Sequence, residues 1–326
     1  MLTDRHQRVH DYLRISLTDS CNFRCTYCMP DEDIFCMPQK LLMQPEEIES
    51  IAKVFVKLGV NKIRLTGGEP LVRKGVVEIM EKLSPLPVKL TLTTNGVLAD
   101  KYIPLFKKAG IRSLNVSLDT LQKDKFLVLT KRDQFDKVWE NILQLVNEGF
   151  SVKVNVVAMK GVNDDEVVNF IKLTKDLPLH IRFIEFMPFS GNQWENSRVI
   201  TARQLLASIE GKLDFIKLKD EKHATAKKFK VPAYTGTFAF ITTMSEPFCG
   251  DCNRMRLTAD GKMKNCLFGE DELDILGTLR AGGDIEPVIR KSLLMKHAVM
   301  GGQFADTYEK TDAGKIHNRS MIKIGG

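Results

Sequence analysis

Residues 13–28, LRISLTDSCNFRCTYC, join a short alternating segment to a cluster of three cysteines. In the first half, three apolar residues alternate with Arg14 and Ser16, which is typical of a β-strand with one apolar and one polar face. The cysteines Cys21, Cys25 and Cys28 follow directly, in the loop that leaves the carboxyl end of this strand. Binding sites of parallel α/β folds lie at that end. The stretch therefore predicts a parallel α/β protein with a metal site near its N-terminus.

The strand-then-helix pattern recurs along the first 190 residues. Strands are predicted at 13–17, 62–66, 88–93, 113–118, 152–157 and 180–186. Helical spacing of apolar residues begins after Pro45, at Phe135 and at Val167. Strands that alternate with helices indicate a parallel sheet with right-handed crossovers.

The predicted strands have an unusual polar face. A parallel strand covered on both sides should be almost continuously apolar, yet these strands alternate and place Arg14, Arg64 and Lys153 on one face. We expect a curved, barrel-like sheet whose basic lumen holds an anionic ligand. The alternative is a polar face that is turned to solvent.

Composition excludes several classes of protein. The chain has 326 residues, of which 43% are hydrophobic and 27% charged, and its mean hydropathy is −0.15. This suits a globular protein of about two domains. No apolar run approaches the ~20 residues of a membrane span, and the first residues are polar, so we expect a cytoplasmic protein without a membrane partner. The net charge of +7 favours an acidic ligand, although a solvated basic surface explains it equally well.

The pattern changes after residue 190. We expect a linker at 191–197, a helix and a strand within 201–218, a strand or hairpin within 231–243, and helices within 269–300. The lysines between 217 and 230 are interleaved with acidic residues, which favours a solvated loop over a nucleic-acid site. The predicted domains are 1–190 and 191–326, the second of them α+β.

The seven cysteines form two triplets and leave Cys36 outside both. An odd, clustered set argues against a disulfide framework. Each triplet, Cys21/Cys25/Cys28 and Cys249/Cys252/Cys266, has one ligand fewer than a structural zinc site or a fully ligated iron–sulfur cube. Two interpretations stay open: a [4Fe–4S] cluster with one open iron, or zinc with a remote fourth ligand such as His297 or His317.

The first triplet resembles the signature of the radical S-adenosylmethionine (SAM) superfamily. Thr66-Gly67-Gly68-Glu69-Pro70 after the second strand matches the glycine-rich segment of that family. The resemblance implies a partial (β/α)6 TIM-like barrel, an α/β fold, closed by a C-terminal α+β domain with a second cluster. It implies that the first cluster binds and reductively cleaves SAM. It also implies SAM contacts at Tyr27, Gly68, Ser117 and Met187.

The second triplet, the segment Asn253-Arg254-Met255-Arg256 and the final Gly325-Gly326 resemble the GTP 3′,8-cyclase family of molybdenum cofactor biosynthesis. This resemblance implies that GTP is bound by Arg14, Arg64, Thr93, Lys153, Arg254 and Arg256. It implies catalytic roles for Arg14, Arg254, Arg256, Gly325 and Gly326. The open iron of the second cluster would hold the guanine ring.

The implied reaction converts GTP to (8S)-3′,8-cyclo-7,8-dihydroguanosine 5′-triphosphate, the first step of molybdenum cofactor biosynthesis, by a radical SAM lyase. The implied cofactors are SAM and two [4Fe–4S] clusters. The implied partners are a flavodoxin- or ferredoxin-type electron donor and the downstream cyclic pyranopterin monophosphate synthase, with a homodimer left open and no nucleic acid. Two alternatives remain: another radical SAM enzyme with an auxiliary cluster, such as a peptide maturase, and a zinc-stabilised nucleic-acid-binding protein.

Overall fold

A computed structural model describes residues 1–28, 36–304 and 307–325. Its centre is one sheet in the order β12-β11-β10-β1-β2-β3-β4-β5-β6-β9-β8-β7. The strands are β1 Tyr12–Ser16, β2 Lys62–Thr66, β3 Lys89–Thr94, β4 Ser113–Ser117, β5 Ser151–Ala158, β6 His180–Glu185, β7 Ile216–Lys217, β8 Lys227–Lys230, β9 Thr237–Ile241, β10 Arg254–Leu257, β11 Lys262–Lys264 and β12 Leu273–Asp274.

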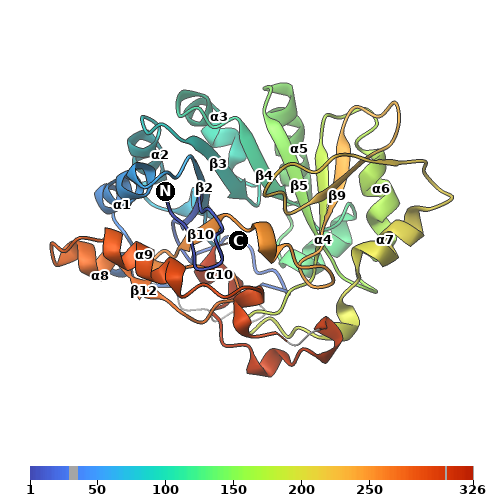
Figure 1. Cartoon of the computed structure of the whole chain (residues 1–326). Helices are drawn as coiled ribbons and strands as arrows, with labels where there is room; N and C mark the ends of the chain where they lie inside the picture. Colours follow the sequence, from blue (N-terminus) through green and yellow to red (C-terminus); the bar gives the residue numbers. More distant parts are fainter. Residues whose placement is uncertain (29–35, 305–306, 326) are drawn as a thin grey trace.

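Helices follow most of the parallel strands. They are α1 Pro45–Lys57, α2 Val76–Leu83, α3 Ala99–Lys108, α4 Lys123–Thr130, α5 Phe135–Asn147, α6 Val167–Lys172, α7 Ala202–Ile209, α8 Ile275–Arg280, α9 Glu286–Leu294 and α10 Met321–Ile324. Figure 1 shows α1, α2, α3 and α5 along the outer side of the curved sheet, while the C-terminal end of the chain lies on the inner side. The predicted α/β partial barrel is confirmed.

The sheet topology brings both ends of the chain to the same edge. Strands β1 to β6 are parallel neighbours in chain order. The later strands extend this sheet on both sides: β10 pairs in parallel with β1, and β9 pairs in parallel with β6. The division at residue 190 stays a prediction, because strands from both sides of it share one sheet.

The alternation of the strands sorts their side chains between two environments. Leu13 and Leu65, both 0% exposed, belong to one hydrophobic cluster with Ile48 of α1 and Ile142 of α5. The intervening polar residues point the other way, since successive strand side chains face opposite sides of a sheet. The helices therefore cover the apolar face, and the polar residues line the inside.

Two predictions for the second half are wrong. Lys227–Lys230 form β8, and not a loop, because Phe229 alternates with the lysines and stacks its ring on Phe238 at 5.5 Å between centroids. The segment 191–197 is packed, and not a free linker, since Trp194 is 6% exposed and its Nε1 donates to the Phe186 carbonyl at 2.9 Å.

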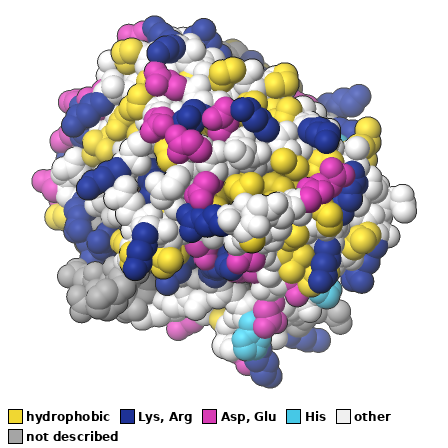
Figure 2. All heavy atoms as spheres, turned by 90° about the vertical axis from the view of Figure 1, so that its left-hand side faces the viewer, with side chains coloured by type: hydrophobic (Ala, Val, Ile, Leu, Met, Phe, Trp, Pro, Cys, Tyr) yellow, Lys and Arg dark blue, Asp and Glu magenta, His cyan; other side chains and the backbone are white. Residues whose placement is uncertain are grey.

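The surface around α1 and α8 mixes both signs of charge. Figure 2 shows basic and acidic side chains interspersed with apolar ones over this side of the molecule. Ion pairs such as Arg280–Glu47, at 2.7 Å, join α8 to α1. Positive charge is thus not gathered into a basic stripe on this face. Among the described residues, no helix has the length and apolar character that crossing a membrane would take.

Candidate active site

Two cavities share a wall at the carboxyl ends of the central strands. The first, of about 190 Å³, is lined by all three cysteines of the first triplet together with Gly68, Ser117 and Met187. The second, of about 200 Å³, is lined by the three cysteines of the second triplet together with Arg14, Arg254 and Arg256. Both cavities are also lined by Asn155, Ile184, Met187 and Met321. The two cysteine triplets therefore face one continuous region.

Hydrogen bonds from the glycine-rich segment hold the loop of the first triplet in place. Gly68 N donates to the Thr18 carbonyl at 2.7 Å, and Glu69 N donates to the Ser20 carbonyl at 2.8 Å. A Cβ at position 68 would lie 2.5 Å from that Ser20 oxygen, so only glycine allows this approach.

Glu69 extends the same attachment to the third strand. Its buried carboxylate accepts from Asn95 N at 2.6 Å and from Thr94 Oγ1 at 2.8 Å. Burial raises the pKa of Glu69 to about 7. The segment therefore fixes the cysteine loop to β2 and to the end of β3.

The residues expected to contact SAM line the first cavity. Tyr27 donates its hydroxyl to Asp119 Oδ2 at 2.7 Å, and Asp119 Oδ1 accepts from Val157 N at 2.8 Å. Burial raises the pKa of Asp119 to about 6. Together these bonds hold Tyr27 at the ends of β4 and β5, and Ser117 and Met187 lie in the same cavity wall.

The thiols of the first triplet suit a multinuclear cluster. Burial raises the pKa of Cys21 to about 11 and that of Cys28 to about 12, so thiolates here need a strong positive partner. A [4Fe–4S] cube takes each thiolate on a different iron. Three cysteines that line one cavity fit the donor set of such a cube with one iron left open.

The second triplet lies between η5, a 3-10 turn at Cys249–Asp251, and the end of β11. Cys249 Sγ accepts from Met300 N at 3.4 Å. Burial raises the pKa of Cys252, but the charges of Arg254 and Lys296 outweigh it and lower that pKa to about 6. Neither His297 nor His317 is among the residues that line this cavity.

Three neighbouring strands present arginines in a row. The register pairs Arg14 with Arg64 of β2 on one side and with Arg256 of β10 on the other. Burial lowers the pKa of Arg256 to about 9 and that of Arg14 to about 10. A site that crowds buried cations in this way is suited to a polyanion.

The other predicted GTP residues lie further along the same face. Arg64 donates to the Leu92 carbonyl at 3.1 Å and to Thr93 Oγ1 at 3.3 Å, and it lines neither cavity. Lys153 lines neither cavity, and burial lowers its pKa to about 8. Thr93 lines the first cavity and not the second.

Sequence reasoning missed two residues of this face. Tyr12 accepts a hydrogen bond from Arg64 Nε at 2.5 Å and one from Arg14 Nη1 at 3.4 Å. Arg182 lines the second cavity and donates to Asn155 Oδ1 at 2.5 Å. The signal for both was present, because each residue continues the alternation that had marked Arg14 and Lys153.

The C-terminal tail reaches the arginine row. Arg256 Nη1 donates to the Gly325 carbonyl at 2.5 Å. Gly325 has a φ of +85°, and a Cβ there would lie 2.5 Å from Thr66 Oγ1 and 2.9 Å from Ser16 Cβ. Gly326 lies outside the described residues. Cys36 is exposed and belongs to neither triplet.

Comparison with known proteins defines the class. The Radical SAM superfamily model matches residues 15–174, and the Molybdenum Cofactor Synthesis C model matches residues 179–300. In the crystal structure of Streptococcus suis SuiB bound to S-adenosylmethionine, 72% of the chain superposes on 94% of this one, with a TM-score of 0.61 and 14% identity. The likeness in structure shows the radical SAM fold.

Relatives of higher identity define the family. The chain is 40% identical to the GTP 3′,8-cyclase of Alkaliphilus oremlandii, with 100% of both chains covered. It is 44% identical to the mitochondrial GTP 3′,8-cyclase of Arabidopsis thaliana, covering 84% of that protein. It is 45% identical to mouse molybdenum cofactor biosynthesis protein 1, of which it spans about half, 51%. The chain belongs to the GTP 3′,8-cyclase family of radical SAM proteins, whose cofactors are SAM and two [4Fe–4S] clusters.

Proposed function

We propose that this chain converts GTP to (8S)-3′,8-cyclo-7,8-dihydroguanosine 5′-triphosphate, the first step of molybdenum cofactor biosynthesis. The observation that carries the proposal is the second cavity. Three cysteines and four arginines line it, and it shares a wall with the cavity of the SAM motif. A purine next to the cysteines with its phosphates on the arginines fits this arrangement, because guanidinium groups bind phosphate oxygens in pairs.

The two triplets would hold the two clusters. The first cluster would be bound by Cys21, Cys25 and Cys28, and the second by Cys249, Cys252 and Cys266. Held by Cys21, Cys25 and Cys28, a reduced cluster would supply the one-electron reduction of SAM. The protein positions SAM through the backbone of Gly68 and through Tyr27, Ser117 and Met187, which line that cavity. Met187 and Asn155 face both cavities and would set the separation of SAM and substrate.

The cations would bind the triphosphate. Arg14, Arg254 and Arg256 lie in the second cavity, and Arg64 and Lys153 continue the basic face beyond it. In this proposal the base lies next to the second triplet, and the phosphates extend toward β2 and β5. Gly325, held by Arg256, would close the lumen against water.

The partners belong to the same proposal. A flavodoxin- or ferredoxin-type protein would supply electrons, and cyclic pyranopterin monophosphate synthase would consume the product. Action in the cytoplasm and formation of a homodimer stay predictions, and the Arabidopsis relative is named as mitochondrial.

The test is the nucleotide dependence of SAM cleavage. The protein is reconstituted anaerobically to roughly eight irons per chain, as two cubes require, reduced, and given SAM with GTP or ATP. We expect 5′-deoxyadenosine and a cyclised nucleotide in equal amounts when the added nucleotide is GTP, and not when it is ATP. Cleavage of SAM that is indifferent to the nucleotide, in fully loaded protein, would overturn GTP as the substrate and favour the peptide-maturase alternative.

A pair of arginine variants controls this test. Arg256→Ala removes a cation of the second cavity and should weaken GTP binding about tenfold or more, since charged hydrogen bonds contribute about 1.5–3 kcal/mol, while iron content is kept. Arg290→Ala removes an exposed arginine of α9 whose ion pair is with Glu286, and should leave binding unchanged.

A further inference from the structure

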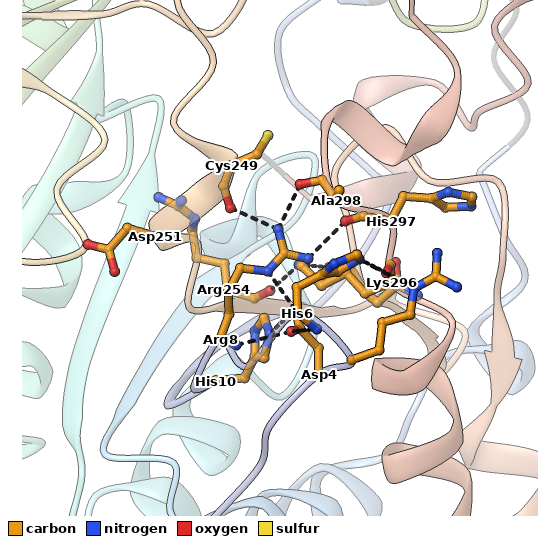
Figure 3. A network of polar contacts seen from close by, with 12 residues as sticks. Asp4, His6, Arg8, His10, Cys249, Asp251, Arg254, Lys296, His297 and Ala298 are labelled. Carbon is orange, nitrogen blue, oxygen red and sulfur yellow. Dashed lines mark hydrogen bonds and ion pairs between the residues drawn. The ribbon is translucent and has the colours of Figure 1, made fainter.

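The N-terminal turn is a buried polar structure that the proposed function does not use. It spans residues 2–10, where Thr3 and Val9 form an antiparallel bridge just before β1. Asp4, Arg8 and His10 are 3%, 8% and 1% exposed. Figure 3 shows these residues packed beneath the loops that carry Cys249 and Lys296–Ala298. Charged groups at this depth must be paired, so their partners define what the turn does.

Asp4 fixes the orientation of Arg8. Its Oδ2 accepts from Arg8 Nε at 2.6 Å, and its Oδ1 accepts from Arg8 N at 3.1 Å. His10 Nε2 lies 3.0 Å from the same Oδ2. Burial and the charge of Lys296 lower the pKa of His10 to about 4, so neutral His10 donates to Asp4 at pH 7. The carboxylate is thus saturated, and the Arg8 guanidinium is held in one direction.

The far end of Arg8 binds backbone carbonyls of two separate loops. Nη1 donates to the Cys249 carbonyl at 2.8 Å and to the Ala298 carbonyl at 2.8 Å, and Nη2 donates to the His297 carbonyl at 2.8 Å. The planar guanidinium suits such a fork, which an ammonium cannot reproduce. Arg8 therefore ties a cysteine of the second triplet directly to the segment after α9.

Lys296 makes the complementary contacts near the other two cysteines. It is 2% exposed, and its Nζ donates to the Arg254 carbonyl at 3.3 Å and to the Asn265 carbonyl. Asn265 precedes Cys266, and Arg254 lies two residues after Cys252. Arg8 and Lys296 together hold the backbone at each of the three cysteines or within two residues of it.

The same contacts set the local charge. The network holds two buried cations, Arg8 and Lys296, and one carboxylate, Asp4, so it leaves a positive charge beside the second triplet. Positive charge and hydrogen bonding around a cluster raise its reduction potential, and supporting residues of this kind typically change affinity or activity 10- to 100-fold.

We propose that Arg8 is a positioning residue for the second cluster. Arg8 fixes the Cys249 loop, and together with Lys296 it fixes the placement of Arg254 and sets the reduction potential of the cluster. The proposal rests on the proposed function only in taking Cys249, Cys252 and Cys266 as cluster ligands.

The test compares Arg8→Gln and Arg8→Lys with Arg290→Gln, a control at an exposed ion pair of α9. Each full-length, reconstituted protein is examined for iron content, for the EPR spectrum of each reduced cluster, for the midpoint potential of each cluster, and for SAM cleavage without nucleotide. In Arg8→Gln we expect a changed EPR signal and a lower potential for the second cluster, an unchanged first cluster, and a GTP turnover at least about tenfold lower. Arg8→Lys keeps the positive charge but not the planar, forked donor geometry of the guanidinium. It should therefore restore the potential of the second cluster more than the GTP turnover.

An unchanged second-cluster spectrum and potential in Arg8→Gln would overturn the proposal, as would equal damage to both clusters. If Arg8→Gln does not fold, Arg8→Lys decides, because a wild-type spectrum and turnover there would show that the fork is dispensable. The spectra and potentials are recorded without nucleotide, so this outcome is independent of whether GTP is the substrate.

Discussion

At the scale of single residues, the tyrosine in the arginine row offsets part of the positive charge of the site. Tyr12 receives hydrogen bonds from Arg64 and Arg14, and the Lys62 ammonium lies 4.2 Å from its ring centroid. Burial alone would raise the pKa of Tyr12, but the charges of Arg14, Arg64 and Lys62 lower it to about 7. The phenolate form offsets these cations and competes with an incoming phosphate.

This competition predicts a pH dependence for GTP binding. Above pH 7 the phenolate predominates, so the affinity of the native protein should fall as the pH rises, by up to about tenfold per pH unit. Tyr12→Phe keeps the ring and should make the fall between pH 7 and pH 8.5 less steep, while the loss of the Lys153 charge, whose pKa is about 8, remains in both proteins. Calorimetric titration at several pH values measures the GTP affinity of the reconstituted native protein and of the reconstituted Tyr12→Phe variant. Parallel pH profiles for the two proteins would refute a role of the phenolate.

The basic residues of the lumen were predictable one by one, but their partners were not. Alternation along single strands identified Arg14, Arg64 and Lys153, since period two is a local property of the sequence. Tyr12 lies on the same face, two residues before Arg14, yet an aromatic residue at the start of a strand is typical of a core. Only the folded structure shows that its hydroxyl accepts a hydrogen bond from Arg64 of β2.

At the scale of elements, the short helix α10 delivers the tail to the lumen. It ends at Ile324, which is 1% exposed, and Gly325 then turns into the space between Ser16 and Thr66. A positive φ and a close approach are both required at this position, which explains a glycine there. The sequence suggested the placement of the tail only through family resemblance, because the tail's partners lie on β1, β2 and β10.

Replacing Gly325 tests this element. Gly325→Ala adds a Cβ that collides with Thr66 and Ser16, so we expect the tail to leave the lumen and GTP turnover to fall at least about tenfold, or 1.4 kcal/mol, while SAM cleavage persists. Gly110→Ala is the matched control, because Gly110 also has a positive φ, of +68°, but no atom within 4 Å of a new Cβ. Product formation and 5′-deoxyadenosine are measured together. Equal losses in both variants would assign the effect to backbone strain alone.

The elements missed by sequence reasoning share one cause. The strand β8 was hidden because lysines dominate its composition, and its inward residue, Phe229, carries the signal alone. The packed segment 191–197 was hidden because its anchor, Trp194, finds its partner at Phe186, directly after β6. Both depend on contacts outside the segment itself, which override local polarity.

At the scale of the whole molecule, two cysteine triplets from opposite ends of the sequence line cavities that share a wall. Clustered cysteines predict a metal site at each triplet, since metal ligands leave spacing patterns, and ligation by these cysteines stays a prediction. Their adjacency was not predictable from spacing, because it depends on β10 pairing with β1. The residues common to both cavities are Asn155, Ile184, Met187 and Met321.

The separation of the two sites predicts a division of labour. Cys252→Ala should remove the second cluster, lowering iron from about eight to about four per chain, and should abolish cyclisation while uncoupled SAM cleavage remains. Cys36→Ala alters an exposed thiol outside both triplets and should change neither quantity. Iron analysis measures the cluster content of each variant, and 5′-deoxyadenosine assays measure its SAM cleavage. If Cys252→Ala stopped all SAM cleavage, the two sites would not be separable.

The pairing of β10 with β1 also constrains how the protein is made. During synthesis β1 and the first cysteine loop leave the ribosome early, whereas β10, the strand that covers the outer edge of β1, follows some 240 residues later. At typical translation rates of about 5–20 residues per second, that edge stays bare for roughly 12–48 seconds. An unpaired edge strand next to unligated thiols invites aggregation and oxidation. Nascent chains of this protein should therefore depend on chaperones, and its clusters are best inserted only after the last strands have joined the sheet.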